Sequence, residues 1–483
     1  MKSSVVVKVT GLLLVLSSLT LLIPIALSLY FDDQELVDLA VAFVGLALIG
    51  ALLLVISRGE VPDLKRGHAF LIVVVTWVFL SAFNAVPLYL AVDGIGVPGA
   101  LFEAVSGLTT TGATVLSSID TLPPSIQFLR QEMQWIGGIG IVVLAIAVAP
   151  VLGVGGMNLL RAELPGPTKD DKIMPRLAQS TRALLWAYLL VTLICAGAYY
   201  LAGMSVFDAI CHSMATVSTG GFSTHDASIG YFNSLAVELI CIFFMLFSSI
   251  SFSQHFGVLL AGRWKTYIKS DETRFFLIAM LVSIVVSWLA LLWWVPGFTG
   301  WTALRYGMFS VVSQVTSTGF GVTDMSAWPA FVPTLLLLLT LMGGCTGSTA
   351  GGIKILRIDI ALKAVLNQVR QLIHPSGVFT VKHDGRPVEV AVISSIWAYL
   401  SLYFLSFHVL NLSFIGLGMT PETAFGAVLT TLNNVGPGLG DVANSFAGAS
   451  DAQKLLASAS MLLGRLEFFP IVVLLTAVYW REV

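Results

Sequence analysis

Charge is scarce in this chain. Asp, Glu, Lys and Arg make up 11% of the 483 residues, 57% of the residues are hydrophobic, and the mean hydropathy is +0.90. Soluble globular chains carry about 25% charged residues. The composition therefore excludes a soluble domain and indicates a polytopic membrane protein in contact with lipid. The net charge of −2 is uninformative by itself, and we expect no nucleic-acid partner.

Cysteine and histidine are also few. The four cysteines have no paired spacing, so we expect small packing residues and no disulfide or metal framework. The seven histidines form no HxxxH or HExxH pair, and the chain has no GxSxG motif. An intramembrane enzyme would need such a nucleophile or metal constellation. We therefore expect that this protein is not an enzyme.

Long apolar runs alternate with short ones along the chain. The runs 9–30 and 36–56 follow each other too closely for a secretory signal and predict a transmembrane hairpin within residues 1–60. An apolar span, a segment of 10–14 residues and a second span then follow in the same order four times. The short segments cannot cross a bilayer, which indicates re-entrant helices. These short segments are 99–109, 206–216, 302–315 and 421–431.

The expected fold class is an all-α membrane protein with ten transmembrane helices. After the N-terminal helical hairpin, four pseudo-symmetric helix–pore loop–helix repeats would surround a central pore. The predicted repeats occupy residues 61–160, 161–262, 263–375 and 376–483.

Each short segment runs into a polar turn that contains glycine. A backbone that aims successive carbonyl oxygens at an axis needs conformations that glycine adopts without strain. The C-terminal end of each short helix carries a partial negative charge that favours a cation. The turns therefore predict a K⁺ selectivity filter lined by carbonyls. The predicted filter residues are Thr110, Thr111, Gly112, Ser218, Thr219, Gly220, Ser317, Thr318, Gly319, Asn434, Val435 and Gly436.

A simpler interpretation of such clusters is that small residues let helices pack closely. One cluster would fit that interpretation. Four clusters at matching places after short helices favour a single-chain, pseudo-fourfold pore.

The basic residues predict the orientation. With a cytoplasmic N-terminus, 21 of the 25 Lys and Arg residues fall on inner segments, which places both ends of the chain inside and the four re-entrant loops outside. Acidic residues near the predicted filters would attract cations to the mouth of the pore, although ordinary solvated or capping acids are the alternative for several of them. These acids are Glu103, Asp120, Asp208, Asp226, Asp324, Glu422 and Asp441.

Two features predict a gate below the filter. The small-residue run 343–352 interrupts the second span of the third repeat, and irregular backbone at membrane depth is tolerated where it lines a cavity. Arg465 lies midway in the apolar segment 453–480, where a cation costs about 3 kcal/mol unless it faces water or a partner. The alternatives are a helix-packing site for the run and a capping role for the arginine. The predicted gate residues are Gly344, Cys345, Thr346, Gly347, Ser348, Thr349 and Arg465.

The four turns resemble those of the bacterial Trk-type potassium-uptake membrane subunit, within the Trk/Ktr/HKT superfamily. The resemblance covers the segments 102–114, 218–226, 316–321 and 433–438 and the run Arg161-Ala162-Glu163-Leu164-Pro165-Gly166-Pro167. It implies an inner-membrane K⁺ transporter, a homodimer with one pore per subunit, and a gate formed by the 343–352 loop and Arg465. It also implies docking on a cytosolic nucleotide-binding ring of the RCK/KTN type.

The expected function is therefore K⁺ uptake through a channel-like pore in a bacterial inner membrane, with K⁺ as the transported ion. The alternative is a Na⁺-coupled or weakly selective monovalent cation permease. The chain contains no P-loop or Rossmann fingerprint, so nucleotide control would have to come from a partner.

Overall fold

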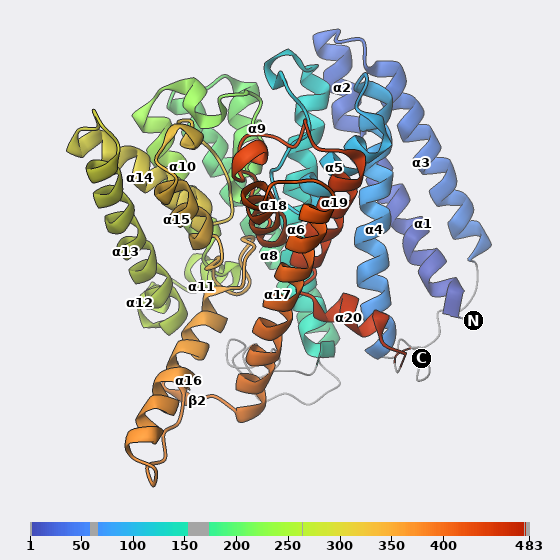
Figure 1. Cartoon of the computed structure of the whole chain (residues 1–483). Helices are drawn as coiled ribbons and strands as arrows, with labels where there is room; N and C mark the ends of the chain where they lie inside the picture. The colour runs from blue at the N-terminus through green and yellow to red at the C-terminus, as the bar shows by residue number, and fades with distance from the viewer. Residues whose placement is uncertain (1, 58–65, 153–172, 263, 478, 480–483) are drawn as a thin grey trace.

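The computed structural model describes residues 2–57, 66–152, 173–262, 264–477 and 479. Within these ranges the chain is helical apart from turns, loops and one two-stranded hairpin (Figure 1). The first half contains α1 (Lys2–Thr20), α2 (Leu22–Phe31), α3 (Leu36–Ile56), α4 (Arg66–Ala91), α5 (Gly96–Leu108), α6 (Pro124–Leu152), α8 (Ile173–Leu201), α9 (Val206–Val217), α10 (Leu235–Ser248) and α11 (Phe252–Ala261).

The second half begins with the short helix α12 and ends with a helix that is bent away from its predecessor. It contains α12 (Lys265–Lys269), α13 (Asp271–Trp294), α14 (Gly300–Val315), α15 (Phe331–Leu339), α16 (Ile355–Ile373), β1 (Lys382–His383), β2 (Arg386–Pro387), α17 (Val390–Gly416), α18 (Pro421–Asn433), α19 (Asp451–Arg465) and α20 (Phe469–Leu475). Short 3-10 turns join several of these helices on the loops that follow the short helices.

Six segments among the described residues are long and apolar enough to cross a membrane, and the number rises to eight if each of two bent pairs counts as one span. The six are Val7–Phe31, Leu36–Ile56, Phe70–Ala91, Arg182–Leu201, Asp271–Trp294 and Val390–Gly416. The chain is thus a multi-pass helical protein, while the total of ten spans stays a prediction.

The outward faces of these helices are apolar. Leu48 and Leu52 on α3 and Leu277, Leu281 and Leu289 on α13 are exposed although they are large hydrophobic residues. Exposed apolar surface of this extent marks an interaction surface in a soluble protein. On helices of this length and composition it is a lipid-facing surface.

The four short helices α5, α9, α14 and α18 lie in the upper half of the molecule as drawn in Figure 1. The start of α1, the helix α20 and the hairpin β1–β2 lie at the lower end, which we call the terminal side. α16 projects furthest on this side. The predicted filter turns are therefore separated along the helix axes from the segments that carry the hairpin.

Three predicted spans are interrupted. The helices α10 and α11 meet at 98°, and α19 and α20 meet at 111°. The segment 453–480 is therefore not one straight span with Arg465 at its middle: α19 ends at Arg465, and Glu467 and Phe468 adopt positive φ angles of 55° and 63°. The third break, between α15 and α16, holds the glycine-rich run 343–352, as the sequence predicted.

Candidate functional site

The four short helices end in the same way. After α5, the Thr110 N–H donates to the Gly107 carbonyl (3.0 Å) and the Thr111 N–H donates to the Ser106 carbonyl (2.9 Å), and Thr110 has a φ of 54°. This is the Schellman arrangement, in which one residue in the left-handed conformation closes a helix. The same bonds and the same conformation recur after the other three helices, where the left-handed residues are Thr219, Ser317 and Asn434.

Glycine usually occupies the left-handed position of this motif, since other residues pay a conformational cost there. Here threonine, serine and asparagine occupy it in all four turns. Backbone strain of this kind persists only where the surrounding structure holds it in place. The repetition of the strain is therefore evidence that the four turns are equivalent. The sequence did not predict this left-handed conformation.

A glycine follows each closing motif, and we call Gly112, Gly221, Gly319 and Gly436 the ring glycines. A Cβ atom on Gly112 would overlap the Gly220 carbonyl oxygen, and one on Gly221 would overlap the Thr318 carbonyl oxygen. A Cβ atom on Gly319 would lie 2.8 Å from the Gly436 nitrogen, and one on Gly436 would lie 2.9 Å from the Gly112 oxygen. Each turn thus touches the next, and the fourth touches the first.

The second turn differs from the sequence prediction by one residue. The prediction aligned Gly220 with Gly112, but Gly220 donates the closing bond to Ala215 (2.8 Å), as Thr111 does to Ser106. Gly221, with a φ of 79°, therefore stands where Gly112 stands, with a φ of 80°. Two adjacent glycines made the register ambiguous in the sequence.

In three of the turns a hydroxyl group on the preceding helix donates a hydrogen bond to a backbone carbonyl of the turn, and we call this bond a brace. Ser106 donates to the Ala113 carbonyl (2.5 Å), Ser313 donates to the Phe320 carbonyl (2.8 Å), and Thr430 donates to the Pro437 carbonyl (2.9 Å). The equivalent residue of the second repeat is Ala215, which has no hydroxyl.

A glutamine from α6 supplies the missing brace in the second turn. The buried Gln134 side chain donates to the Gly220 carbonyl (2.6 Å) and accepts from the Phe222 N–H (3.0 Å). Sequence reasoning missed Gln134, because the residue lies 86 positions before the turn that it holds. The only sequence signal was a cluster of polar residues in the first half of an apolar span.

The run 343–352, which we call the glycine loop, lies directly against the turns. The Gly351 N–H donates to Ser317 Oγ (2.6 Å), and the Gly352 N–H donates to the Asn433 carbonyl (3.2 Å). Thr349 Oγ1 accepts from Thr219 Oγ1 (3.1 Å). The loop therefore contacts the second, third and fourth turns on their terminal side.

Other contacts hold the outer part of the glycine loop. The Cys345 N–H donates to the Ser249 carbonyl (2.8 Å), at the break between α10 and α11. The Thr346 N–H donates to Glu272 Oε1 (2.6 Å), at the start of α13. Gly347 accepts from the Phe252 N–H (3.1 Å). Gly344, Cys345, Thr346, Gly347, Ser348 and Thr349 thus form one compact turn structure that bonds to three helices.

Arg465 joins the predicted gate residues. Its Nη1 donates to the Thr349 carbonyl (3.0 Å), while Nε and Nη2 have no hydrogen-bond partner among the described residues. The side chain is buried and stands in the last turn of α19, where a helix C-terminus favours a cation. Sequence reasoning left two roles open for Arg465, and the bond to Thr349 is of the carbonyl-capping kind.

Two further cations, the partly exposed Arg357 and the buried Lys354, support this junction. Arg357 on α16 pairs with Glu467 (2.5 Å) and stacks over the Tyr399 ring at 4.0 Å. Lys354 donates to the Ala350 carbonyl of the glycine loop. The sequence analysis treated Lys354 and Arg357 only as markers of orientation, but both side chains hold the end of the loop.

Glu103 does not face solvent at an entrance to the filter turns, contrary to the sequence prediction. Its carboxylate is buried and pairs with Arg130 of α6 at 2.8 Å. Arg130 also donates to the Ser223 carbonyl (3.3 Å) and stacks over Phe222 at 4.1 Å. The pair is therefore a buried link between the first two turns, and a buried charge of this kind is stable only when paired.

Three of the other predicted acids lie together: Asp120 and Asp226 are on the loops after α5 and α9, and Asp208 is in the first turn of α9. Asp120 accepts from His225 (2.6 Å), and Asp226 accepts from the Ile119 N–H (2.9 Å). Partial burial raises the pKa of the Asp120 carboxyl, but the hydrogen bonds from His225 and Asp226 outweigh it and hold this pKa below its ordinary value. Asp208 accepts from Thr224 (2.7 Å). The Asp120 carboxylate therefore stays ionised at neutral pH, and its negative charge attracts cations to this face.

The proline-containing run 161–167 lies outside the described residues. Every predicted filter and gate residue lies within them. The filter residues gather in the four turns, and the gate residues gather beneath the turns on the terminal side.

Comparison with known proteins agrees with this arrangement. A family model described as TrkH, cation transport protein, matches residues 40–481. The Trk system potassium uptake protein TrkH of Vibrio parahaemolyticus is 43% identical over 480 residues, which covers 99% of each chain. The TrkH protein of Halomonas elongata is 42% identical over 483 residues, which covers 100% of each chain.

The crystal structure of the potassium transporter TrkH from Vibrio parahaemolyticus superposes with a TM-score of 0.93 at 41% sequence identity and covers 100% of both chains. The resemblance expected from the four turns is confirmed over nearly the whole chain. This chain belongs to the TrkH family of cation transport proteins.

Proposed function

We propose that this protein takes up K⁺ across a bacterial inner membrane, and that the four turns form its selectivity filter. The observation that carries the proposal is the closed contact of the ring glycines, each against the next repeat. Carbonyl groups held around one axis can replace the water around K⁺. Four helix C-termini that point at the same place add a favourable potential for a cation.

We propose further that the glycine loop and Arg465 form the gate. The loop contacts three of the four turns on their terminal side, and Arg465 bonds to it from α19. A buried guanidinium with two unbonded nitrogens near an ion path raises the barrier to cations.

The orientation and the partners belong to the same proposal. The order of the apolar runs supports the four repeats, and the distribution of basic residues supports both chain ends inside. The homodimer is carried over from the resemblance to the Trk-type subunit. A cytosolic nucleotide-binding ring of the RCK/KTN type would dock on the terminal side. In support, α16 projects on that side (Figure 1). Its exposed apolar residues are Leu362, Val365, Leu366, Val369, Leu372 and Ile373.

The first prediction concerns the ion. The purified protein in lipid vesicles is expected to take up rubidium, and a tenfold excess of Na⁺ in the assay should leave most of the uptake intact because the filter fits K⁺ and Rb⁺. Empty vesicles are the control. Uptake that Na⁺ suppresses, or uptake that requires Na⁺, would favour the weakly selective or Na⁺-coupled permease instead.

The second prediction concerns Gln134. Replacing it with alanine leaves the Gly220 carbonyl and the Phe222 N–H buried without their partner, at a cost of about 1–3 kcal/mol for each group. We expect rubidium uptake or K⁺/Na⁺ discrimination to fall by about tenfold or more. The matched control is Gln131→Ala, one turn away on α6, because the Gln131 amide has no hydrogen-bond partner among the described residues. Equal effects of the two substitutions would contradict the bracing role.

A further inference from the structure

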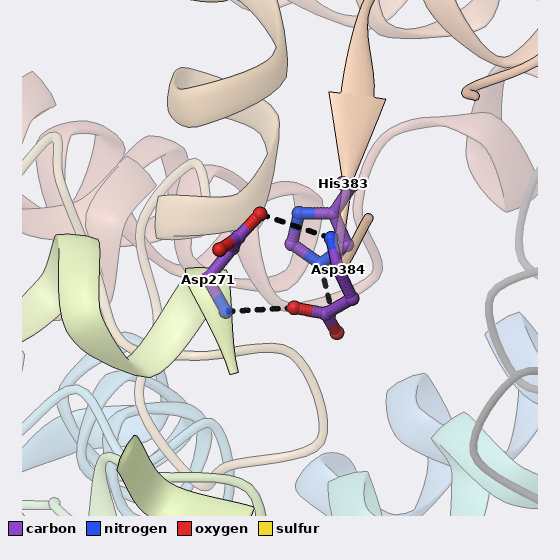
Figure 2. Close-up of side chains that lie close together, drawn as sticks. All are labelled: Asp271, His383 and Asp384. Carbon is purple, nitrogen blue, oxygen red and sulfur yellow. Dashed lines mark hydrogen bonds and ion pairs between the residues drawn. The ribbon is translucent and has the colours of Figure 1, made fainter. Parts of the chain in front are cut away.

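The hairpin β1–β2 brings three potential metal ligands together on the terminal side, away from the four turns. His383 and Arg386 pair across the hairpin, and Asp384 and Gly385 form its two-residue turn with φ angles of 48° and 76°. Two positive φ angles in a two-residue turn are typical of a type I′ hairpin, for which Asp-Gly is a preferred sequence. The turn places Asp384 against Asp271, the first residue of α13 (Figure 2).

Asp271 and Asp384 hold each other through their backbones. The Asp271 N–H donates to Asp384 Oδ1 (2.7 Å), and the Asp384 N–H donates to Asp271 Oδ2 (2.9 Å). These reciprocal bonds fix both carboxylates in position, although the two carry like charges. The other two oxygens, Asp271 Oδ1 and Asp384 Oδ2, accept no hydrogen bond from the described part of the chain and stay available to a ligand (Figure 2).

The His383 imidazole points between carboxylates and is not hydrogen-bonded to any of them. The side chain is 10% exposed, Nε2 lies 3.7 Å from Asp384 Oδ2, and Nδ1 lies 3.6 Å from Asp359 Oδ2. Both distances exceed a hydrogen bond, and among the described residues Nδ1 has no hydrogen-bond partner. A nine-tenths buried ring nitrogen therefore faces carboxylate oxygen with space between the two atoms.

The charges around the cluster are unbalanced. Lys363 Nζ lies 2.6 Å from Asp359 Oδ2 and 3.8 Å from Asp271 Oδ2, so it chiefly neutralises Asp359. Arg274 is mostly exposed and lies 3.9 Å from Asp271. Among the residues that the structure describes, no Lys or Arg forms an ion pair with Asp384, whose only ionic neighbour is His383. A cation at that place would relieve the repulsion between two carboxylates and a nitrogen lone pair.

We propose that Asp271, His383 and Asp384 bind a divalent transition-metal cation of the Zn²⁺ or Mn²⁺ class. One ligand atom from each residue lies within 4.8 Å of the other two, and ligand atoms around a tetrahedral Zn²⁺ lie about 3.3 Å apart. Side-chain rotations that move the ligand atoms by about 1 Å would bring them to the spacing that Zn²⁺ needs. One imidazole and two carboxylates suit these metals better than they suit Ca²⁺ or Mg²⁺, which take oxygen ligands alone.

Asp359 would support the metal without touching it. A carboxylate at the far nitrogen of a ligating histidine sets the tautomer and the ring orientation. With its proton on Nδ1 towards Asp359, His383 presents the Nε2 lone pair to the metal. Water would complete the coordination, because Asp384 is about half exposed, with a side-chain exposure of 49%.

The metal would join two segments that both hydrogen-bond to the glycine loop. Glu272, the neighbour of Asp271, accepts the Thr346 N–H of the loop (2.6 Å). The hairpin follows α16, whose first residue, Ile355, donates to the Gly344 carbonyl (3.1 Å). A metal bound at the cluster therefore fastens the start of α13 to the far end of the α16 segment. This site stands independently of which ion crosses the pore.

The test uses the full-length protein, purified in detergent and freed of metal with a chelator. Calorimetric titration with Zn²⁺, and separately with Mn²⁺, is expected to show one site per chain. His383→Ala should weaken binding by about 100-fold, and Asp359→Asn should weaken it by about tenfold. Asp384→Asn keeps a side-chain oxygen that can accept from the Asp271 N–H, so the turn is preserved. It removes the carboxylate charge, and metal binding should be lost.

The matched control is His374→Ala, an exposed histidine at the end of α16 that should leave binding unchanged. Zn²⁺ should raise the Tm of the wild type and of His374→Ala but not the Tm of His383→Ala. Pulsed EPR of bound Mn²⁺ should show a nitrogen coupling that disappears in His383→Ala. Absence of saturable binding of both metals, or equal binding by the two histidine variants, would overturn the proposal.

Discussion

Alanine at Gly221 is expected to abolish K⁺ uptake, and it should be more harmful than alanine at Gly220. A Cβ atom on Gly221 would overlap the Thr318 carbonyl oxygen of the next turn, which belongs to the backbone and cannot move without distorting the ring. The residue also has a φ of 79°, where a side chain adds strain of about 1–3 kcal/mol. A Cβ atom on Gly220 meets the Gln134 side chain, which can move only by giving up its bonds to the turn, so the expected loss is that of Gln134→Ala.

Growth on low K⁺ of a host that lacks its own K⁺ uptake measures this effect, together with rubidium uptake into vesicles. Alanine or serine at Gly112, Gly319 or Gly436 should also lower uptake or K⁺ preference by about tenfold or more. Gly197→Ala on α8 is the control, because a Cβ atom there meets nothing within 4 Å. Normal growth and unchanged selectivity in all four ring variants would falsify the filter assignment.

Replacing Arg465 with alanine is expected to increase the flux of rubidium. For an assumed separation of about 8 Å and an effective dielectric constant of about 20, a unit charge repels a monovalent cation by about 2 kcal/mol, which corresponds to about thirtyfold in rate. The substitution also removes the bond from Nη1 to the Thr349 carbonyl, so the glycine loop loses one of its attachments. Loss of the charge and loss of this attachment should both increase the flux.

Separate variants distinguish the two effects. Arg465→Lys keeps the charge and should retain a low flux. Thr349→Val also keeps the charge, but it removes the hydroxyl bonds to the Val217 and Ser248 carbonyls, so it tests the attachment of the loop alone. Deletions within 344–349 should raise the flux further. Lys454→Ala, near the start of α19, is the control. If Arg465→Ala and the deletion both leave flux unaltered in folded protein, neither element obstructs the path.

The sequence identified the right segments but not their contacts. The short helices, the four turns and the interruption at 343–352 follow from apolar run lengths and from the polar residues at the ends of the runs. These are local properties, so a linear pattern carries them. The family was expected from the resemblance of the four turns to a known family. The bounds predicted for the short helices agree with α5, α9, α14 and α18 to within a few residues.

The errors concern residues whose role depends on a distant partner. Glu103 was expected at the mouth of the pore, but it pairs with Arg130, 27 residues away, inside the protein. Arg465 was expected inside a straight span, but α19 ends there and Glu467 turns towards Arg357 on α16. Gln134 was not singled out, because nothing near it in the sequence shows that it replaces a hydroxyl missing at Ala215.

The sequence by itself determined that this is a multi-pass helical membrane protein, because hydropathy and turn chemistry act over a few residues at a time. Its resemblance to the Trk-type subunit lay in the short segments around the four turns and the run 161–167. Only the tertiary structure decided which glycine of the pair Gly220-Gly221 belongs to the ring, since that depends on which carbonyl of the neighbouring repeat lies opposite. It also decided that Arg465 bonds to the glycine loop and that Asp271 meets Asp384 in the hairpin turn, 113 residues away in sequence. Such pairings arise when helices pack around a common axis, and no local pattern encodes them.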